Sequence, residues 1–175
     1  MEEKRLQRQQ VFAGRIIDVY NDTVQLPNGK EASREVVEHR GAVAVLAIDN
    51  DGKLVLVKQY RYPIQRLSLE IPAGKLEENE APLTCAQREL EEETGYAAGK
   101  WSPIFSYYTS PGFTNEVIHL FLAEDLHYVG VHPDEDEFVE SQVYSLEEAI
   151  TAIDHAEIFD VKTITAIYWW KTRGM

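Results

Sequence analysis

Three glutamates in the middle of the chain carry the clearest chemical signal. Glu89, Glu92 and Glu93 stand at positions i, i+3 and i+4, so on an α-helix their side chains converge on one face. Like charges at these spacings repel by roughly a few tenths of a kcal/mol per pair. A hard divalent cation removes that repulsion, and an oxygen-rich site suits Mg²⁺ or Mn²⁺. The spacing is therefore compatible with a metal site on a helix.

A glutamate-rich helix face can also be an ordinary solvated surface, and these residues alone favour that interpretation. The wider segment favours the metal site. From Gly74 to Tyr96 it resembles the signature of the Nudix hydrolase family, G-x5-E-x7-R-E-U-x-E-E-x-G-U, where U is aliphatic. The matching residues are Gly74, Glu80, Arg88, Glu89, Leu90, Glu92, Glu93 and Gly95. Only Tyr96 departs, and it still places a large apolar side chain in the last aliphatic position.

This resemblance implies hydrolysis of a diphosphate attached to a nucleoside. A metal ion would neutralise charge on the phosphoryl oxygens, orient the substrate and acidify a bound water. The resemblance implies Mg²⁺ as the metal, with Mn²⁺ as a substitute, held by Glu89, Glu92 and Glu93. The backbone carbonyl of Ala73 is expected to join them, and Glu92 and Arg88 are expected to act in catalysis.

Two further features resemble the bacterial ADP-ribose pyrophosphatases within this family. The segment EIPAGKLE leads into the signature, and Pro111 follows Gly95 by sixteen residues. In that subfamily, a proline at this offset lies in a Ser-Pro-Gly turn beside the terminal ribose, which here is Ser110-Pro111-Gly112. Any turn can contain Pro-Gly, so the turn supports the subfamily only together with the signature.

The group that activates the attacking water must lie outside the signature helix if its glutamates hold metal. The acidic segment HPDEDEFVE is the natural source, because loops on a rigid sheet can close over a substrate. In the subfamily a glutamate just before the next strand is the general base, and Glu137 matches that position. The alternatives that stay open are Glu135, Asp136 and Glu140.

The substrate's diphosphate and adenine require cations and a stacking surface. Arg61 in KQYRYP matches an arginine that contacts the diphosphate in relatives, and Arg34 could reach the site across a dimer. Each arginine could equally be a surface charge. The aromatic residue that stacks on adenine stays open among Phe12, Tyr20, Tyr60 and Tyr62. The five histidines show no metal-binding spacing.

The elements that position these residues can be predicted from local patterns. We expect the signature helix to be capped by Asn79, to accept Pro82 in its first turn and to end at Thr94, with Gly95 as the stop. The Ser145–Glu148 capping box predicts a second helix to about residue 156, and Asp160 is expected to cap the last helix. Apolar runs predict strands at 41–48, 53–62, 68–76, 101–109, 116–123 and 138–146.

The first forty residues are predicted to be rich in strands. Runs at 11–20, 23–26 and 31–39 are strand-like, and Asn28-Gly29 favours a hairpin with a primed turn. Residues 1–10 are expected to be a mobile or weakly helical end. The pattern and the resemblance predict an α/β fold: a Nudix-type α/β/α sandwich with a mixed β-sheet, preceded by a small N-terminal β segment. Residues 1–40 would form the dimerisation segment and residues 41–175 the Nudix hydrolase domain.

Composition excludes several classes of partner. With 17 basic and 30 acidic residues the formal net charge is −13, which argues against nucleic acid and anionic membranes. The single cysteine, Cys85, excludes an internal disulfide and indicates a reducing compartment. The polar N-terminus lacks the apolar core of a secretory signal, and about 18 consecutive apolar residues occur nowhere. We therefore expect a cytoplasmic protein.

The preferred functional interpretation is Mg²⁺-dependent hydrolysis of ADP-ribose to AMP and ribose 5-phosphate by a homodimer. One alternative keeps the chemistry and changes the substrate to a sugar nucleotide or a flavin or nicotinamide dinucleotide; a diadenosine polyphosphate is disfavoured by Pro111. Another alternative is a module that binds ADP-ribose without cutting it. Such modules usually lose a metal-binding glutamate, and here all of them are present.

Overall fold

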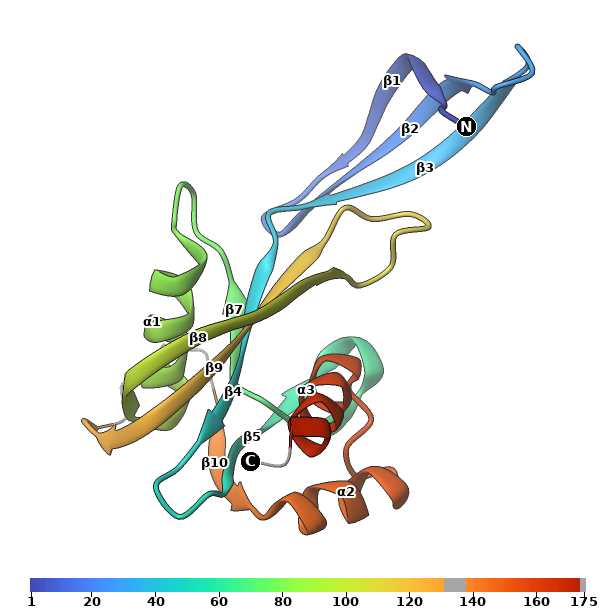
Figure 1. The fold of residues 1–175 in the computed structure, drawn as a ribbon. Helices are drawn as coiled ribbons and strands as arrows, with labels where there is room; N and C mark the ends of the chain where they lie inside the picture. Colours follow the sequence, from blue (N-terminus) through green and yellow to red (C-terminus); the bar gives the residue numbers. More distant parts are fainter. Residues whose placement is uncertain (131–137, 174–175) are drawn as a thin grey trace. The chain divides into compact units, whose positions relative to one another are not determined.

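The computed structural model describes residues 1–130 and 138–173, and the chain divides into two compact units (Figure 1). The N-terminal unit comprises residues 1–42 and 106–118, and the main unit comprises 43–105 and the chain from residue 119 onward. Within the described part, no helix is long and apolar enough to cross a membrane.

The N-terminal unit contains a three-stranded antiparallel sheet in the order β1-β2-β3. Its strands are β1 (Lys4–Ala13), β2 (Ile17–Gln25) and β3 (Glu31–His39). The expectation of a mobile or helical end at residues 1–10 was wrong, because β1 pairs with β2 from Lys4 onward. Arg8 explains why so polar a segment forms a strand: it pairs with Asp22 on β2 and Glu38 on β3 and lies over the Tyr20 ring. Cross-strand charge pairs replace apolar contacts here.

The hairpin between β2 and β3 is present, but its turn differs from the predicted primed type. A primed turn of this kind needs positive φ at both central residues. Only Gly29 has it, at 85°, whereas the Asn28 side chain accepts a hydrogen bond from the Lys30 backbone at 3.0 Å. The loop closes through Leu26 N–H donating to the Lys30 carbonyl at 2.7 Å. Asn28 thus stabilises the turn through its side chain and keeps an ordinary backbone conformation.

A second stretch of chain completes the N-terminal unit. Strands β8 (Tyr96–Tyr108) and β9 (Val117–Tyr128) are longer than predicted, and the connection between them lies in this unit. Val37 on β3 donates to the Phe113 carbonyl at 2.7 Å and accepts from Asn115 N–H at 3.3 Å. The backbone N–H of His39 donates to Asn115 Oδ1 at 2.8 Å. The connection is therefore held against the end of β3.

The described strands of the main unit belong to a seven-stranded mixed sheet in the order β10-β5-β4-β9-β8, with β6 on β5 and β7 on β4. The remaining strands are β4 (Ala42–Ile48), β5 (Leu54–Arg61), β6 (Arg66–Glu70), β7 (Ala73–Lys75) and β10 (Glu140–Tyr144), and a short 3-10 helix spans Tyr62–Ile64. Val43–Ala47 are fully buried, which confirms a strand covered on both faces. The predicted strand 68–76 is divided at Ile71-Pro72, since proline cannot donate to a strand neighbour.

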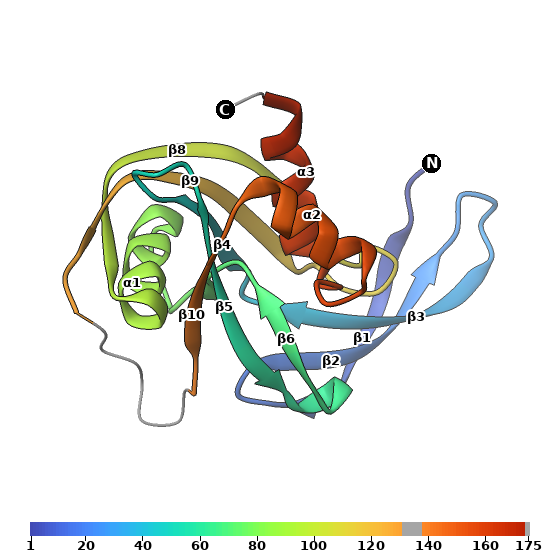
Figure 2. The ribbon, with the colours of Figure 1, turned by 90° about the horizontal axis from the view of Figure 1, so that it is seen from below.

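Helices cover both faces of the central strands. Figures 1 and 2 show α1 (Pro82–Thr94) on one side of β4 and β5, and α2 (Leu146–Asp154) and α3 (Val161–Arg173) on the other. On α1, Cys85, Ala86 and Leu90 are buried and pack with apolar residues of β4, β5 and β9. The free thiol of Cys85 is one of these core groups, and burial raises its pKa to about 12. The expected sandwich, with small N-terminal strands, is confirmed.

The helix boundaries test the predicted caps. Gly95 ends α1 with φ of 73° and donates to the Glu91 carbonyl at 2.8 Å, as predicted. The expected Asn79 cap was wrong: the N-cap is Ala81, and Asn79 instead has φ of 62° in a separate turn. That turn closes when the Glu80 backbone donates to the Glu77 carbonyl at 3.2 Å and the Glu77 backbone donates to Glu80 Oε2 at 3.0 Å. The chain therefore enters α1 two residues later.

Candidate active site

The three glutamates of α1 differ in exposure. Glu89 and Glu93 are 7% and 4% exposed, whereas Glu92 is only partly covered. Glu93 Oε2 accepts a hydrogen bond from the backbone N–H of Ala73 at 2.9 Å. Buried carboxylates require such partners, because an uncompensated charge in the interior is strongly unfavourable. The helix thus directs two charged groups toward the β7 segment instead of toward solvent.

Arg88 lies among the acidic side chains and pairs with three of them. Its Nη1 donates to Glu89 Oε1 at 2.8 Å and to Glu92 Oε2 at 2.9 Å. Its Nε and Nη2 donate to the two oxygens of Glu80 at 3.1 and 3.2 Å. These hydrogen bonds from Arg88 lower the pKa of Glu80 to about 2. Arg88 therefore holds the acidic residues of the signature in a fixed arrangement and keeps Glu80 ionised.

Gly74 allows the backbone to lie directly against Glu89. A Cβ placed on Gly74 would meet Glu89 Cδ at 1.8 Å and its carboxylate oxygens at 1.9 and 2.2 Å. A side chain at position 74 would displace the Glu89 carboxylate, so glycine here allows the close approach and is not needed for an unusual φ. Ala73 and Gly74 together position two of the three glutamates: one donates to Glu93, and the other leaves room for Glu89.

The donor set suits a divalent metal, since its side chains offer only carboxylate oxygens within one helical turn. In the described part of the chain, however, no group of three or more His, Cys, Asp or Glu side chains lies close enough to hold one ion. Arg88 donates hydrogen bonds to Glu89 and Glu92, and the backbone N–H of Ala73 donates one to Glu93. The residues present fit a metal in their chemistry, and the three carboxylates would have to move closer together to bind one ion.

Arg61 belongs to a second polar cluster at the ends of β5 and β6. Its Nε and Nη2 donate to the two oxygens of Glu70 at 2.9 and 2.6 Å, a bidentate pair. Glu70 is 2% exposed; burial alone would raise the pKa of Glu70, but Arg61 and Lys162 lower it to about 2. The side chain of Arg61 remains 40% exposed. The pair therefore holds the guanidinium of a partly exposed side chain in one orientation.

Sequence reasoning missed Glu70 and Lys162 as parts of this cluster. Lys162 on α3 pairs with Glu70 and lies 3.0 Å from Asp160 Oδ2. Asp160 was predicted only as a helix cap, and it does accept from the Thr163 backbone at 3.0 Å. Glu70 and Lys162 are 92 residues apart, so no local pattern links them. The available signal was a glutamate beside two fully apolar positions, in LEIPA, which suggests a buried charge that needs a partner.

Arg34 and the Ser-Pro-Gly turn both lie in the N-terminal unit. Arg34 on β3 donates through Nε and Nη2 to the Glu3 carboxylate at 2.9 and 2.5 Å, and this pairing raises the pKa of Arg34. The Ser110 carbonyl accepts from Phe113 and Thr114 N–H, both at 3.1 Å, which closes the turn. Pro111 and Gly112 are exposed, and a Cβ on Gly112 would meet no atom within 4 Å. The turn is therefore accessible.

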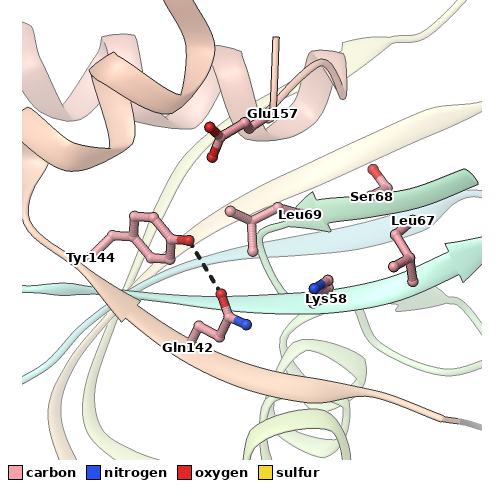
Figure 3. Close-up of a pocket in the computed structure, with 7 residues that line it drawn as sticks. All are labelled: Lys58, Leu67, Ser68, Leu69, Gln142, Tyr144 and Glu157. Carbon is pink, nitrogen blue, oxygen red and sulfur yellow. Dashed lines mark hydrogen bonds between the residues drawn. The ribbon is translucent and has the colours of Figure 1, made fainter. Parts of the chain in front are cut away.

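The predicted general base, Glu137, lies outside the described residues, as do Glu135 and Asp136. Glu140 is described: it is exposed and begins β10 opposite Lys58 on β5. Lys58 also lines a pocket of about 220 Å³ in the main unit (Figure 3). The pocket is lined by Lys58, Leu67, Ser68, Leu69, Gln142, Tyr144 and Glu157. None of the predicted site residues lines this pocket. The side chains of Lys58 and Arg61 point to opposite faces of β5, because the two residues are three positions apart.

Comparison with known proteins finds two matching domains and two similar proteins from Bacillus species. Residues 38–165 match the NUDIX domain, and residues 3–37 match the nucleoside diphosphate sugar hydrolase N-terminal domain. The chain is 50% identical over 171 residues to a Bacillus subtilis protein named ADP-ribose pyrophosphatase, covering 97% of this chain and 92% of that protein. It is 46% identical over 172 residues to the methanol dehydrogenase activator of Bacillus methanolicus, covering 96% and 92% of the two chains.

A solved structure shares the fold. It is described as an ADP compounds hydrolase, with a TM-score of 0.86, 21% identity and coverage of 99% of this chain and 97% of the other. At this identity, the likeness concerns the fold. The match to the domain over residues 38–165 and the extensive identity to the Bacillus proteins establish the ancestry. The chain belongs to the Nudix hydrolase family.

Proposed function

We propose that this protein is a Mg²⁺-dependent ADP-ribose pyrophosphatase, which converts ADP-ribose and water to AMP and ribose 5-phosphate. The observation that carries the proposal is the support given to the α1 glutamates: Glu93 bonds to Ala73 N–H, and Glu89 lies against Gly74. The 50% identity to the protein named ADP-ribose pyrophosphatase supports the choice of substrate.

In this proposal Glu89, Glu92 and Glu93 hold Mg²⁺, for which Mn²⁺ can substitute, together with the Ala73 carbonyl. When bound, the metal supplies charge neutralisation at the diphosphate and a more acidic water. Arg88 acts by orienting Glu89 and Glu92, to which it donates hydrogen bonds. Glu137 takes the proton from the attacking water.

The remaining residues bind the substrate. Arg61 directs its guanidinium at the diphosphate, since its pairing with Glu70 uses Nε and Nη2 and leaves Nη1 outside the pair. Ser110, Pro111 and Gly112 would contact the terminal ribose, and the exposure of Pro111 and Gly112 agrees with that role. Arg34 would leave Glu3 to reach the substrate of a second subunit.

We further propose a cytoplasmic homodimer in which residues 1–40 form the dimerisation segment and residues 41–175 the hydrolase domain. Support comes from apolar side chains on β1 of the N-terminal unit. Leu6, Val11 and Phe12 are 46%, 57% and 55% exposed. Exposed apolar groups gathered on one element favour contact with another protein surface.

A second candidate substrate is a sugar nucleotide. The match of residues 3–37 to the nucleoside diphosphate sugar hydrolase N-terminal domain favours it. Dinucleotide substrates would use the same chemistry. A module that binds ADP-ribose without cleavage is the weaker candidate, because the glutamates Glu89, Glu92 and Glu93 are all retained.

The test is a substrate panel with the purified chain and Mg²⁺, with chromatography to separate AMP from ribose 5-phosphate. ADP-ribose is expected to give the highest kcat/KM against a GDP-sugar, NADH, FAD and diadenosine polyphosphates. Replacing both Glu92 and Glu93 by Gln should lower kcat/KM on the order of 100-fold or more, because two metal ligands are lost. Glu78→Gln, at an exposed variable position of the signature, is the control.

Two results would contradict the proposal. A higher kcat/KM for the GDP-sugar would assign the enzyme to sugar nucleotides, and binding of ADP-ribose without release of AMP would favour the non-catalytic module.

A further inference from the structure

The first turn of α3 contains a lysine that is almost completely buried. Lys162 is 7% exposed, and the neighbouring Thr163 is fully buried. Lysine is rarely buried unless it is paired, because removal of an ammonium group from water is costly. Lys162 has two such partners: it donates a hydrogen bond to Glu70 Oε2, and its Nζ lies 3.0 Å from Asp160 Oδ2.

Glu70 joins Lys162 to Arg61. Oε2 of Glu70 accepts from both Lys162 Nζ and Arg61 Nη2, while Oε1 accepts from Arg61 Nε. The carboxylate is therefore held from two sides, and the Arg61 guanidinium is held by two parallel bonds. Such fork-like pairs fix the plane of the guanidinium as well as its position.

Thr163 connects the same helical turn to the backbone that follows Glu70. Its Oγ1 accepts a hydrogen bond from Ile71 N–H at 2.9 Å and donates to Asp160 Oδ2 at 2.6 Å. Two residues after Ile71, Ala73 N–H holds Glu93. Residues 70–73 thus contact Arg61, the first turn of α3 and Glu93 in succession.

A cluster that served stability alone would not need this geometry. Replacement of a whole buried ion pair by packed apolar groups is often neutral or stabilising, so the presence of such a pair is weak evidence for a role in stability. Here the charged residues end at an arginine whose side chain remains 40% exposed. The arrangement therefore favours orientation of an accessible cation.

We propose that Lys162 is a positioning residue that orients Arg61 toward the diphosphate through Glu70, with Asp160 and Thr163 anchoring it to α3. This inference rests on the proposed function in one respect, the binding of the diphosphate by Arg61. The C-terminal helix then contributes to substrate binding through its effect on Arg61.

The experiment compares Lys162→Met with Ile167→Val in the full-length protein. Ile167 is a fully buried residue of the same helix, outside the charged cluster, so its substitution lowers stability without changing Arg61. Lys162→Met is expected to raise KM for ADP-ribose at least about tenfold with kcat within about threefold, because a pre-organised binding group is lost. Ile167→Val is expected to leave KM unchanged while lowering the melting temperature.

A second readout needs no substrate. The ¹H–¹⁵N signal of Arg61 Nε, assigned by its disappearance in Arg61→Lys, reports whether this N–H is held. In the wild-type protein and in Ile167→Val it should be protected from exchange with water, and in Lys162→Met it should lose that protection. Glu70→Gln breaks the same link from the other end, is expected to give the same KM and signal, and replaces Lys162→Met if that variant does not fold.

The outcomes separate the two proposals. An unchanged KM and a protected Arg61 signal in Lys162→Met, or in its replacement Glu70→Gln, would overturn the positioning role. A KM shift equal to that of Ile167→Val would do the same. If the wild-type protein does not cleave ADP-ribose, the proposed function fails, and the Arg61 signal still decides whether Lys162 positions Arg61.

Discussion

The position of the Glu89 side chain depends on the absence of a side chain at Gly74. Its carboxylate lies where the Cβ of any residue other than glycine at position 74 would be. Arg88 holds the same carboxylate at 2.8 Å from the other direction. The position of Glu89, a proposed metal ligand, therefore depends on the absence of a side chain at Gly74 and on the hydrogen bond from Arg88. A small side chain added at position 74 should affect function more than folding.

Gly74→Ala should weaken metal binding about 10- to 100-fold, the usual result of disturbing a group that supports a ligand. The added methyl group would push the Glu89 carboxylate aside. Titration of Mn²⁺, followed by electron paramagnetic resonance, measures the affinity. Gly112→Ala is the matched control, because its Cβ meets open space. Equal Mn²⁺ affinity in the two variants would argue against Glu89 as a ligand.

For single residues, the sequence predicted which side chains belong to the candidate site better than it predicted their hydrogen-bond partners. The spacing of Glu89, Glu92 and Glu93 placed them within one helical turn, because helical geometry is local. The spacing could not show that Arg88 would bridge Glu80, Glu89 and Glu92, since three acceptors compete for one guanidinium. The partnership of Lys162 with Glu70 depends on how α3 packs and has no local signature.

Among the elements, α2 has the most complete N-terminal cap. The Ser145 hydroxyl accepts from Glu148 N–H at 3.2 Å, and the Glu148 side chain accepts from Ser145 N–H at 2.8 Å. Both bonds give partners to backbone N–H groups, which otherwise lack them at the start of a helix. The cap is distant in sequence from the signature, so its role should be stability alone.

Ser145→Ala is expected to lower the free energy of unfolding by about 1 kcal/mol, the typical cost of losing a serine cap. Urea denaturation measures that change, and kcat/KM should stay at the wild-type value. Thr151→Ala, an exposed position within the same helix, should change stability by less than about 0.5 kcal/mol. Equal losses for the two variants would mean that the capping box contributes little.

Elements with strong local signals were predictable, and those that depend on distant partners were not. The Gly95 stop, the Ser145 box and the buried strand β4 each follow from residues within a few positions. The first part of strand β1, before Val11, was missed because its pairing depends on ion pairs from Arg8 to β2 and β3. The Asn79 cap was wrong because Glu80 closes a separate turn just before the helix.

For the whole molecule, the proposed dimer gives a direct expectation about mass. Sedimentation equilibrium should give twice the 20.0 kDa of one chain. Val11→Asp places a charge on β1, where Val11 is 57% exposed, and should weaken association at least about tenfold because an apolar contact would become a buried charge. Val129→Asp, an exposed valine of the main unit, should leave the mass unchanged. A monomeric wild-type protein would end the dimer proposal.

The N-terminal unit is assembled from residues 1–42 and from 106–118, far along the chain. Val37 and His39 bond to that second stretch, which includes the Ser110-Pro111-Gly112 turn. In a chimera in which only residues 1–42 came from a relative, residues 106–118 would have to bond to a β3 strand of different sequence. Substitutions in β3 should therefore also affect a turn that is proposed to contact the ribose, although the two segments are far apart in the sequence.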